Sequence, residues 1–503
     1  MSESKKQIWG NRTSVKPSED NIKYCAGRDV SAKKMADEIL IPYDIWNNQA
    51  HCLMLHQQKI LSEDKLASIL KALDKALKLN QKAKFILAPE YEDVHMNIEK
   101  FVTEETGIDA GGYMHTARSR NDQSATDMRL YMRDELLELL KGGIDLVKSI
   151  LELAKKHTTT VMPGFTHHQL ATVTTFGHWL ASYAQAIIRD LERFVFSYDI
   201  MNINPLGAAA AFGTPWNIDR ELTTQYLGFD HVQENSLDCI TSRWEMETQS
   251  ATAVSFFMTH LSIISEDILF LSSGAYPMLI IDDRYVTGSS IMPQKRNPDF
   301  AEVTKAKTAL VNGMSQSLWG IAKAMMSGYN RDTQWTKYII MDIFDEVRLA
   351  SKIFSGVFDT IKINENVMFR LSNQKFANAS IIADYMASTR KIAFRVAYNA
   401  IAKAVNLCEK EGILSYSIVN KVFKEIENCS PISKKEWENL SDPLKMIEQR
   451  KHTGGPAPES VMTNIKNLSG KIEGIYKEYA KREQKLTKAK ENLNSVIKKH
   501  IKK

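Results

Sequence analysis

Apolar side chains recur at steps of three and four residues over most of the chain. From Met128 to Leu153 this spacing persists for about seven helical turns. The segment from Trp244 to Ser273 is apolar around most of its circumference, which is typical of a helix buried inside a bundle. The segment 299–326 continues with alanine-rich helical sequence, and strand-like alternation is rare. The pattern predicts an all-α protein with a central bundle of very long helices.

Proline placement supports this prediction. No proline occurs in 90–162, in 216–276 or in 299–430. An interior proline costs a helix about 3 kcal/mol, so these stretches are free to form long helices.

The pattern divides the chain into three helical domains. We expect an N-terminal domain at 1–117, a central bundle domain at 118–370 with a distinctive loop at 284–299, and a C-terminal domain at 371–503. Between Asn428 and Pro458, proline and glycine predict loops. The tail from Lys481 holds nine lysines and arginines and is expected to be solvated and partly helical, with an anion-binding arm as the alternative.

Composition narrows the class of protein. The net charge of +5 is too small to indicate nucleic-acid binding. The five cysteines are far apart with no Cys-x-x-Cys spacing, which favours reduced thiols in a cytoplasmic protein over disulfides or a zinc site. The polar first residues do not resemble a signal peptide, and no run of 18 apolar residues predicts a membrane span.

The loop at 288–299 is the most distinctive chemical feature. Its sequence is GSSIMPQKRNPD, which places Ser289 near the cation of Lys295 and the amide of Asn297. A serine that must give up a proton needs positive charge, backbone N–H groups and little water. The alternative is a surface turn that leads into a helix at Pro298, with Asn297 as its N-cap.

Four other polar clusters stand out. Ser119, Arg120 and Asn121 precede a long helix and could form a carboxylate receptor, or a helix cap with surface ion pairs. Thr166 and His167 offer a ligand contact and a proton donor, with a structural role in the loop as the alternative.

The other two clusters carry weaker signals. Tyr329, Gln334 and Lys337 offer a hydroxyl, an amide and an ammonium group for a polar ligand. The alternative is that this segment is a solvated connection between helices. His95 follows an acid pair at a helix start, where acids are expected from the helix dipole. A metal there is disfavoured because no second His or Cys stands at ligand spacing.

These clusters occur in the order and rough spacing of one family, and the chain resembles the argininosuccinate lyases of the fumarase/aspartase superfamily. The matching passages are 9–10, 43–45 with 50–51, 92–95, 115–123, 163–167 with 175–178, 205–207, 218–220, 234–238, 288–299, 329–332 and 454–458. The run Arg118–Gln123 is characteristic of this branch.

The resemblance implies a homotetramer whose long helices form a twenty-helix core, with each active site built from three chains. It also implies elimination of an amine from the small molecule argininosuccinate, an N-substituted aspartate, to leave fumarate. Ser289 resembles the general base, His167 the proton donor, and Lys295 and Asn297 the groups that stabilise the intermediate. The substrate-binding set would be Ser119, Arg120, Asn121, Thr166, Arg243, Tyr329, Gln334, Lys337, Asp37 and His95. No metal or organic cofactor, nucleic acid or membrane is implied.

The departures from the family pattern concern the amine half of the substrate. Lys33 stands at a serine position, Asn47 and Asn48 replace Gly-Ser, Thr172-Val173 replaces Gln-Pro, and Trp244 ends a run that has lost two acids. A lysine near the amine would repel a guanidinium. A lyase for another N-succinyl amine, similar to ethylenediamine-disuccinate lyases, therefore stays open, as does a non-catalytic structural homologue.

Overall fold

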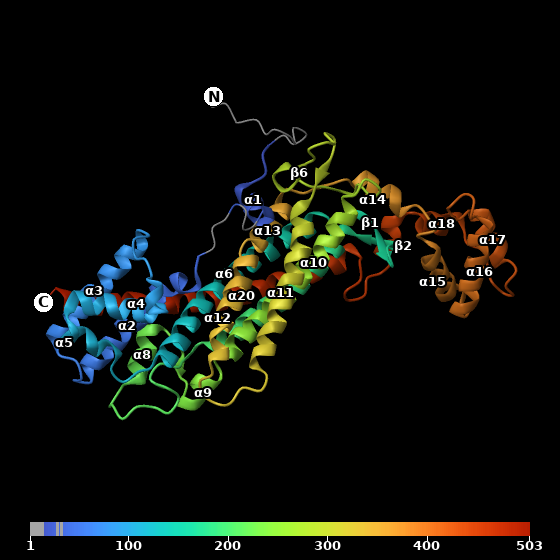
Figure 1. The fold of residues 1–503 in the computed structure, drawn as a ribbon. Helices are drawn as coiled ribbons and strands as arrows, with labels where there is room; N and C mark the ends of the chain where they lie inside the picture. Colours follow the sequence, from blue (N-terminus) through green and yellow to red (C-terminus); the bar gives the residue numbers. More distant parts are fainter. Residues whose placement is uncertain (1–14, 27–29, 31–33, 503) are drawn as a thin grey trace.

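The computed structural model describes residues 15–26, 30 and 34–502, and it is built almost entirely from helices (Figure 1). The all-α prediction is confirmed. The strands that occur among the described residues form four separate two-stranded pairs.

The central bundle consists of long helices that pack side by side. It contains α6 (Arg120–Lys156), α7 (Phe176–Met201), α10 (Arg243–Leu271), α11 (Asp299–Ala322), α12 (Thr336–Val347) and α13 (Ala350–Thr360). Helices α10 and α11 form an antiparallel pair, in which the Thr308 hydroxyl donates to the Met258 carbonyl at 2.9 Å. The predicted helices at 128–153, 244–273 and 299–326 are therefore confirmed, with the last one ending at Ala322.

Among the described residues, α10 alone is long and apolar enough to span a membrane by length and composition. A buried bundle helix passes the same test, and α10 packs against α7, α11 and α12. Its apolar character is that of a bundle helix.

The N-terminal region packs on the bundle at two separate places (Figure 1). Its elements are α1 (Glu19–Ala26), α2 (Ala36–Gln57), α3 (Glu63–Gln81), η2 (Pro89–Tyr91), α4 (Val94–Thr106), α5 (Ile108–Gly111) and η3 (Gly112–His115). Helix α1 packs on α11 and α13, whereas α2, α3 and α4 pack on one another. Helix α2 contains Pro42 in its interior, which the proline argument did not anticipate.

A smaller helical unit with its own apolar core follows the bundle. Its core comes from α15 (Ala379–Arg390), α16 (Phe394–Leu407), α17 (Tyr416–Phe423) and α18 (Lys434–Ser441). The flanking helices α14 (Glu365–Ser372) and α19 (Pro443–Glu448) pack instead on the hairpin at residues 161–175. The loops predicted between Asn428 and Pro458 are thus interrupted by α18 and α19. Ser433 and Asp442 cap these helices, and Pro443 is compatible with the first helical turn.

The last helix, α20 (Pro458–Ile501), returns along α6 and α7 to reach α3 (Figure 1). The tail from Lys481 was expected to be solvated, and this expectation was wrong for one face of the helix. Leu486, Ala489, Leu493 and Ile497 recur at helical spacing and are buried, while the lysines between them face solvent.

Short strands and helices complete the connections. The pairs are β1 (Val161–Thr166) with β2 (Gln169–Thr175), β3 (Ile203–Asn204) with β4 (His231–Val232), β5 (Leu279–Ile280) with β8 (Lys362–Ile363), and β6 (Thr287–Gly288) with β7 (Arg296–Asn297). Only β3 and β4 are parallel. The short helices are α8 (Arg220–Leu227), α9 (Ser236–Thr241), η4 (Asp283–Tyr285) and η5 (Arg331–Gln334).

Candidate active site

The sequence-predicted residues gather in three places: the start of α6, the β1–β2 turn and the β6–β7 loop. At the start of α6, Ser119 is the N-cap, and its hydroxyl accepts from the Asn121 N–H at 3.3 Å. Asp122 completes a capping box, because one carboxylate oxygen accepts from the Ser119 N–H at 2.9 Å. The capping interpretation of Ser119 is therefore correct, and the positive end of the α6 dipole is directed at this point.

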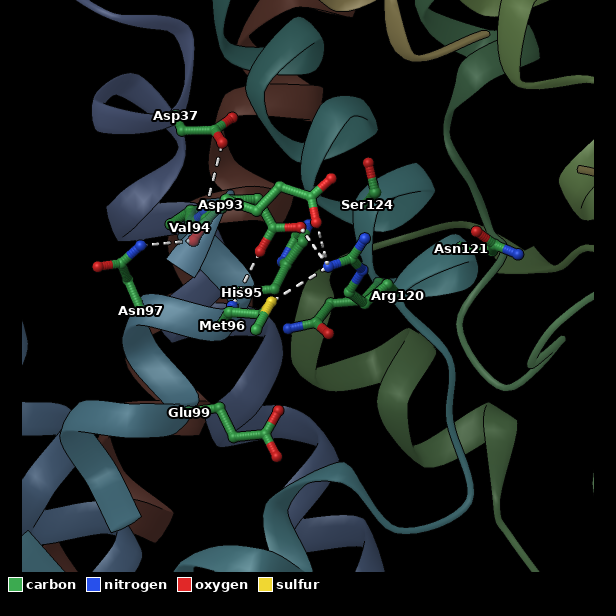
Figure 2. A network of polar contacts seen from close by, with 12 residues as sticks. Asp37, Asp93, Val94, His95, Met96, Asn97, Glu99, Arg120, Asn121 and Ser124 are labelled. Atoms are coloured by element: carbon green, nitrogen blue, oxygen red, sulfur yellow. Dashed lines mark hydrogen bonds and ion pairs between the residues drawn. The ribbon is translucent and has the colours of Figure 1, made fainter. Parts of the chain in front are cut away.

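Arg120 lies between acids from the start of α4 (Figure 2). Its guanidinium is 3.2 Å from an Asp93 oxygen, 3.5 Å from a Glu92 oxygen and 3.3 Å from the Met96 sulfur. Asp93 also caps α4 by accepting from the Met96 N–H at 2.9 Å. Because Arg120 remains partly exposed, a carboxylate from solution can reach it and compete with these acids.

Asp37 and Lys337 meet beside this group. The Lys337 ammonium is 2.5 Å from one Asp37 oxygen, and the other oxygen accepts from the Val94 N–H at 3.3 Å. The two residues stand 300 positions apart, and both side chains are largely buried. An ion pair held in this way fixes the first turns of α2, α4 and α12 relative to one another.

Arg243 connects the start of α10 to α6. Its buried guanidinium donates to the Ser124 hydroxyl at 3.0 Å and lies 5.5 Å from the centre of the Tyr329 ring. Burial lowers the pKa of Arg243 and raises the pKa of Glu247, one turn further along α10, to about 7. Gln334 lies in η5, half-buried, one turn before Lys337.

We call the group formed by Asp37, Glu92, Asp93, Arg120, Arg243, Tyr329 and Lys337 the Arg120 cluster. The sequence singled out Glu92 and Asp93 as an acid pair before His95, but it did not predict that they pair with Arg120. Arg331, which lies 2.8 Å from Glu92, was not predicted as a site residue. Asn121 points away from the acid partners of Arg120 (Figure 2).

His95 lies behind the Arg120 cluster in a buried polar network. Its Nδ1 donates to Asp44 at 2.7 Å, and an Asp127 oxygen is 3.5 Å away. Burial opposes the ionisation of Asp44, but His95 and Arg118 hold the pKa of Asp44 below its ordinary value. Burial and the neighbouring Asp44 carboxylate raise the pKa of Asp127. His95 therefore contacts two carboxylates in the interior, and it supports α4 beneath Asp93.

Asn47 and Asn48 belong to the same network, contrary to the expectation that they border the amine half of the substrate. Asn48 donates to Asp44 at 2.7 Å and accepts from Arg118, while Asn47 donates to Asp127 at 2.8 Å. Both asparagines are fully buried. The sequence shows that a helix position is polar, but it does not show whether the side chain contacts a ligand or a neighbouring helix. Lys33 lies outside the described residues, and Trp244 packs against Trp319.

Thr166 and His167 lie at the turn of a β-hairpin at the other end of α6. The two turn residues, His167 and His168, have φ of 53° and 58°, the left-handed backbone of a tight two-residue turn. Non-glycine residues adopt this conformation at a cost in free energy, so the turn is held by its surroundings. Phe165 packs on Phe270 and Tyr276 below it, and the His167 side chain is presented to solvent.

Ser289 begins the loop between β6 and β7. Its Oγ accepts from the backbone N–H groups of Ile291 at 3.3 Å and Met292 at 3.1 Å. Two donors aimed at one oxygen favour its negatively charged form. Lys295 is exposed, so the water-poor positive surroundings expected for Ser289 are not provided by this chain by itself.

Asn297 pairs with Thr287 in the strands below the loop, and the N-cap position of α11 is Pro298, which makes no side-chain capping hydrogen bond. The alternative of Asn297 as helix N-cap was therefore wrong. The base of the loop is fastened by Arg296, which donates to the Ile281 carbonyl at 2.7 Å and binds Asp283. The loop thus combines a fixed base with an exposed tip.

The Arg120 cluster lies far from the other two places. Helix α6 has 37 residues, which corresponds to about 55 Å. Arg120 is at its first residue, and the β1–β2 hairpin follows its last turn. Helix α10 has 29 residues, or about 43 Å. Arg243 begins α10, and the Ser289 loop follows its other end. One chain therefore brings the residues of the Arg120 cluster together but leaves Thr166, His167 and Ser289 at the opposite end of the bundle.

Comparison with known proteins gives a consistent result. A family model described as lyase matches residues 26–313, which is more than half of the chain, and a model described as argininosuccinate lyase C-terminal matches 376–448. The argininosuccinate lyase of Bacillus velezensis is 35% identical over 456 residues, covering 91% of this chain and 97% of the relative. That of Acetivibrio thermocellus is 38% identical over 424 residues, covering 84% and 91%.

Solved structures share the fold at lower sequence identity. A crystal structure of EDDS lyase in complex with formate aligns with a TM-score of 0.87 at 24% identity, covering 98% of this chain and 97% of the other. A recombinant class II fumarase from Schistosoma mansoni aligns with a TM-score of 0.69 at 14% identity, covering 86% and 96%. The long-helix bundle is common to all three.

Proposed function

The chain belongs to the argininosuccinate lyase family, and on that premise we propose that it cleaves argininosuccinate to arginine and fumarate. The reaction breaks the bond between a carbon of the succinyl unit and the substituted nitrogen. A proton leaves the neighbouring carbon, and the new double bond forms between the two carbons. The nitrogen accepts a proton from a general acid as its bond to carbon breaks.

Ser289 is the proposed base. The proton to be removed lies next to a carboxylate and is very weakly acidic, so the base must be an alkoxide formed well below the ordinary pKa of a hydroxyl. The two N–H donors on the Ser289 oxygen are the observation that carries this assignment. They supply part of the stabilisation that an alkoxide requires, and Lys295 supplies positive charge in the same loop.

Lys295 and Asn297 would stabilise the doubly charged carboxylate of the intermediate, and His167 would protonate the departing nitrogen on the opposite face of the substrate. The exposed position of His167 at a held turn suits a group that acts on a molecule outside its own chain.

The Arg120 cluster is proposed to bind the substrate. Ser119, Arg120, Asn121 and Arg243 of one chain, together with Thr166 of a neighbouring chain, would hold the two carboxylates of the succinyl unit. Asp37, Tyr329, Gln334 and Lys337 would contact the remainder. We assign His95 a positioning role, because its contacts run through Asp44 and Asp127 rather than toward the exposed surface.

A complete site requires more than one chain, and a homotetramer with three chains at each site is proposed. The separation of about 40 Å or more between the Arg120 cluster and the Ser289 loop supports this. Exposed apolar side chains along α10 and α11 give the bundle a surface suited to further helices, namely Phe256, Ile263, Leu310 and Trp319, each about half exposed. A cytoplasmic location is proposed on the same family premise.

The test is a substrate panel. Purified protein is incubated with argininosuccinate and with several other N-succinyl amines, and fumarate is followed by its ultraviolet absorbance. Formation of fumarate and arginine from argininosuccinate is the expected result. Fumarate release only from another N-succinyl amine would move the substrate assignment while leaving the reaction type intact, and silence with every compound would refute the proposed function.

A further inference from the structure

A second cluster of chemically active side chains lies where the end of the chain meets the N-terminal region. His56 is in the last turn of α2, Glu63 is the first residue of α3, and His500 is in the last turn of α20. The Glu63 carboxylate is 3.0 Å from His56 Nε2 and 2.9 Å from His500 Nδ1. Figure 1 shows the C-terminal end of α20 beside α3, away from β6 and the Ser289 loop.

The hydrogen bond of His56 to the backbone determines which of its ring nitrogens presents a lone pair to the cluster. Its Nδ1 is 2.9 Å from the Leu61 carbonyl oxygen, which can only accept, so Nδ1 carries a proton. In the neutral ring, Nε2 is then an unprotonated nitrogen directed at a carboxylate. Two electron-rich atoms at 3.0 Å require a cation or a proton between them. Metal-binding histidines usually have this arrangement, with the distal N–H donated to a backbone carbonyl.

We propose that His56 Nε2, Glu63 and His500 Nδ1 bind a divalent transition-metal ion, with Zn²⁺ the best match. Two imidazoles and one carboxylate are ligands that zinc accepts, whereas Mg²⁺ and Ca²⁺ prefer oxygen ligands throughout. The ligand atoms all lie within 4.8 Å of one another. Tetrahedral zinc with bonds of about 2.0–2.2 Å would separate any two ligand atoms by about 3.4 Å. Each imidazole nitrogen, now 3.0 or 2.9 Å from the Glu63 carboxylate, would therefore move away from that carboxylate by about half an ångström.

The cluster is accessible to an ion from solution. The side chains of His56, Glu63 and His500 are 28%, 35% and 17% exposed. A water molecule can therefore take the fourth position. The two rings stand edge to face with centroids 5.3 Å apart, which leaves both nitrogens directed at the same carboxylate.

The role of this metal is structural. It joins the last turn of α20 to the α2–α3 connection across 437 residues of sequence. The same helix already buries Leu493 and Ile497 just before His500, so the metal would fix the end of a helix that is partly docked by apolar contacts. Because it binds the folded chain only, the metal would raise thermal stability.

Cobalt binding tests the proposal directly. The full-length protein, without a histidine tag and treated with a chelator, is titrated with Co²⁺, whose visible absorption bands report tetrahedral coordination. We expect one Co²⁺ per chain, displaced by Zn²⁺. His500→Ala should weaken binding by at least about 100-fold, since loss of an outer partner alone costs 10–100-fold. His231→Ala, an exposed histidine outside the cluster, is the matched control and should bind as the parent does.

Thermal unfolding provides a second readout that does not depend on lyase activity. Added Zn²⁺ should raise the unfolding temperature of the parent and of His231→Ala, but not that of His56→Ala or His500→Ala. Absence of cobalt bands in the parent, or equal bands in parent and His500→Ala, would overturn the proposal. In that outcome the cluster is an ionic contact between protonated imidazoles and Glu63.

Discussion

Under the proposal that the residues of one site come from different chains, mixing two inactive variants should restore activity. Ser289→Ala removes the proposed base, and Arg120→Gln removes a carboxylate contact at the far end of the bundle. Arg120 begins α6 and is joined through Ser124 and Arg243 to the start of α10, whereas Ser289 follows the end of α10. The length of α10, about 43 Å, exceeds any reach of these side chains.

The expected magnitude follows from random assembly. When equal amounts of the two variants assemble, each site receives an intact Ser289 half of the time and an intact Arg120 half of the time. If the two residues come from different chains, about one quarter of the sites are complete. Ser289→Ala by itself should retain below about 1% of the activity, since loss of a general base costs about 10²–10⁴-fold. Arg120→Gln should also be strongly impaired, because it loses the cation proposed to bind a substrate carboxylate.

The assay uses co-expression of the two variants with different affinity tags, isolation through both tags, and measurement of fumarate release. Mixing Arg120→Gln with Lys337→Met is the matched control, because both residues belong to the Arg120 cluster of one chain and the mixture should stay inactive. Activity of the Ser289→Ala and Arg120→Gln mixture no higher than that of the separate variants would refute the shared site.

Three further predictions concern the base, a buried acid and the last helix. Ser289→Ala should lower kcat by about 10²–10⁴-fold without changing the sedimentation behaviour, and near-normal turnover would remove Ser289 as the base. Burial raises the pKa of Glu247 from 4.5 to about 7, so the folded protein holds this proton more tightly than the unfolded chain, and its contribution to stability is lost as pH rises through that range. The unfolding temperature of the parent should therefore fall relative to that of Glu247→Gln between pH 4.5 and 7, and parallel curves would contradict the assignment. Leu493→Ala should lower the free energy of unfolding by about 2–5 kcal/mol, measured by denaturant unfolding, whereas the exposed neighbour Asn492→Ala should be nearly neutral; equal effects would mean that this end of α20 is not docked.

The helices of the bundle could be predicted from sequence because their periodicity is a local property. The predicted start at Trp244 differs from the observed start of α10 by one residue, and the predicted start at Asp299 agrees with that of α11. Where the chain is polar and rich in lysine, the same method failed. The stripe from Leu486 to Ile497 was too sparse among the lysines to be recognised as a buried face.

The site residues show the same division. Ser119 to Asn121 and the Ser289 loop could be singled out because their chemistry is concentrated within a few residues. The pairing of Arg120 with Glu92 and Asp93, and the Asp37–Lys337 contact across 300 positions, could not be predicted, because such pairs exist only after helices pack. Asn48 was expected near the substrate and is instead buried against Asp44 and Arg118.

The sequence by itself thus determined the helical class and the chemical groups available for the reaction, since both depend on the types and spacing of neighbouring residues. The tertiary structure decided which of these groups meet. Rigid helices of about 40–55 Å separate the Arg120 cluster from Ser289 and His167 within one chain. The physical reason is that a helix fixes the distance between its ends, whereas the sequence records only how many residues lie between them.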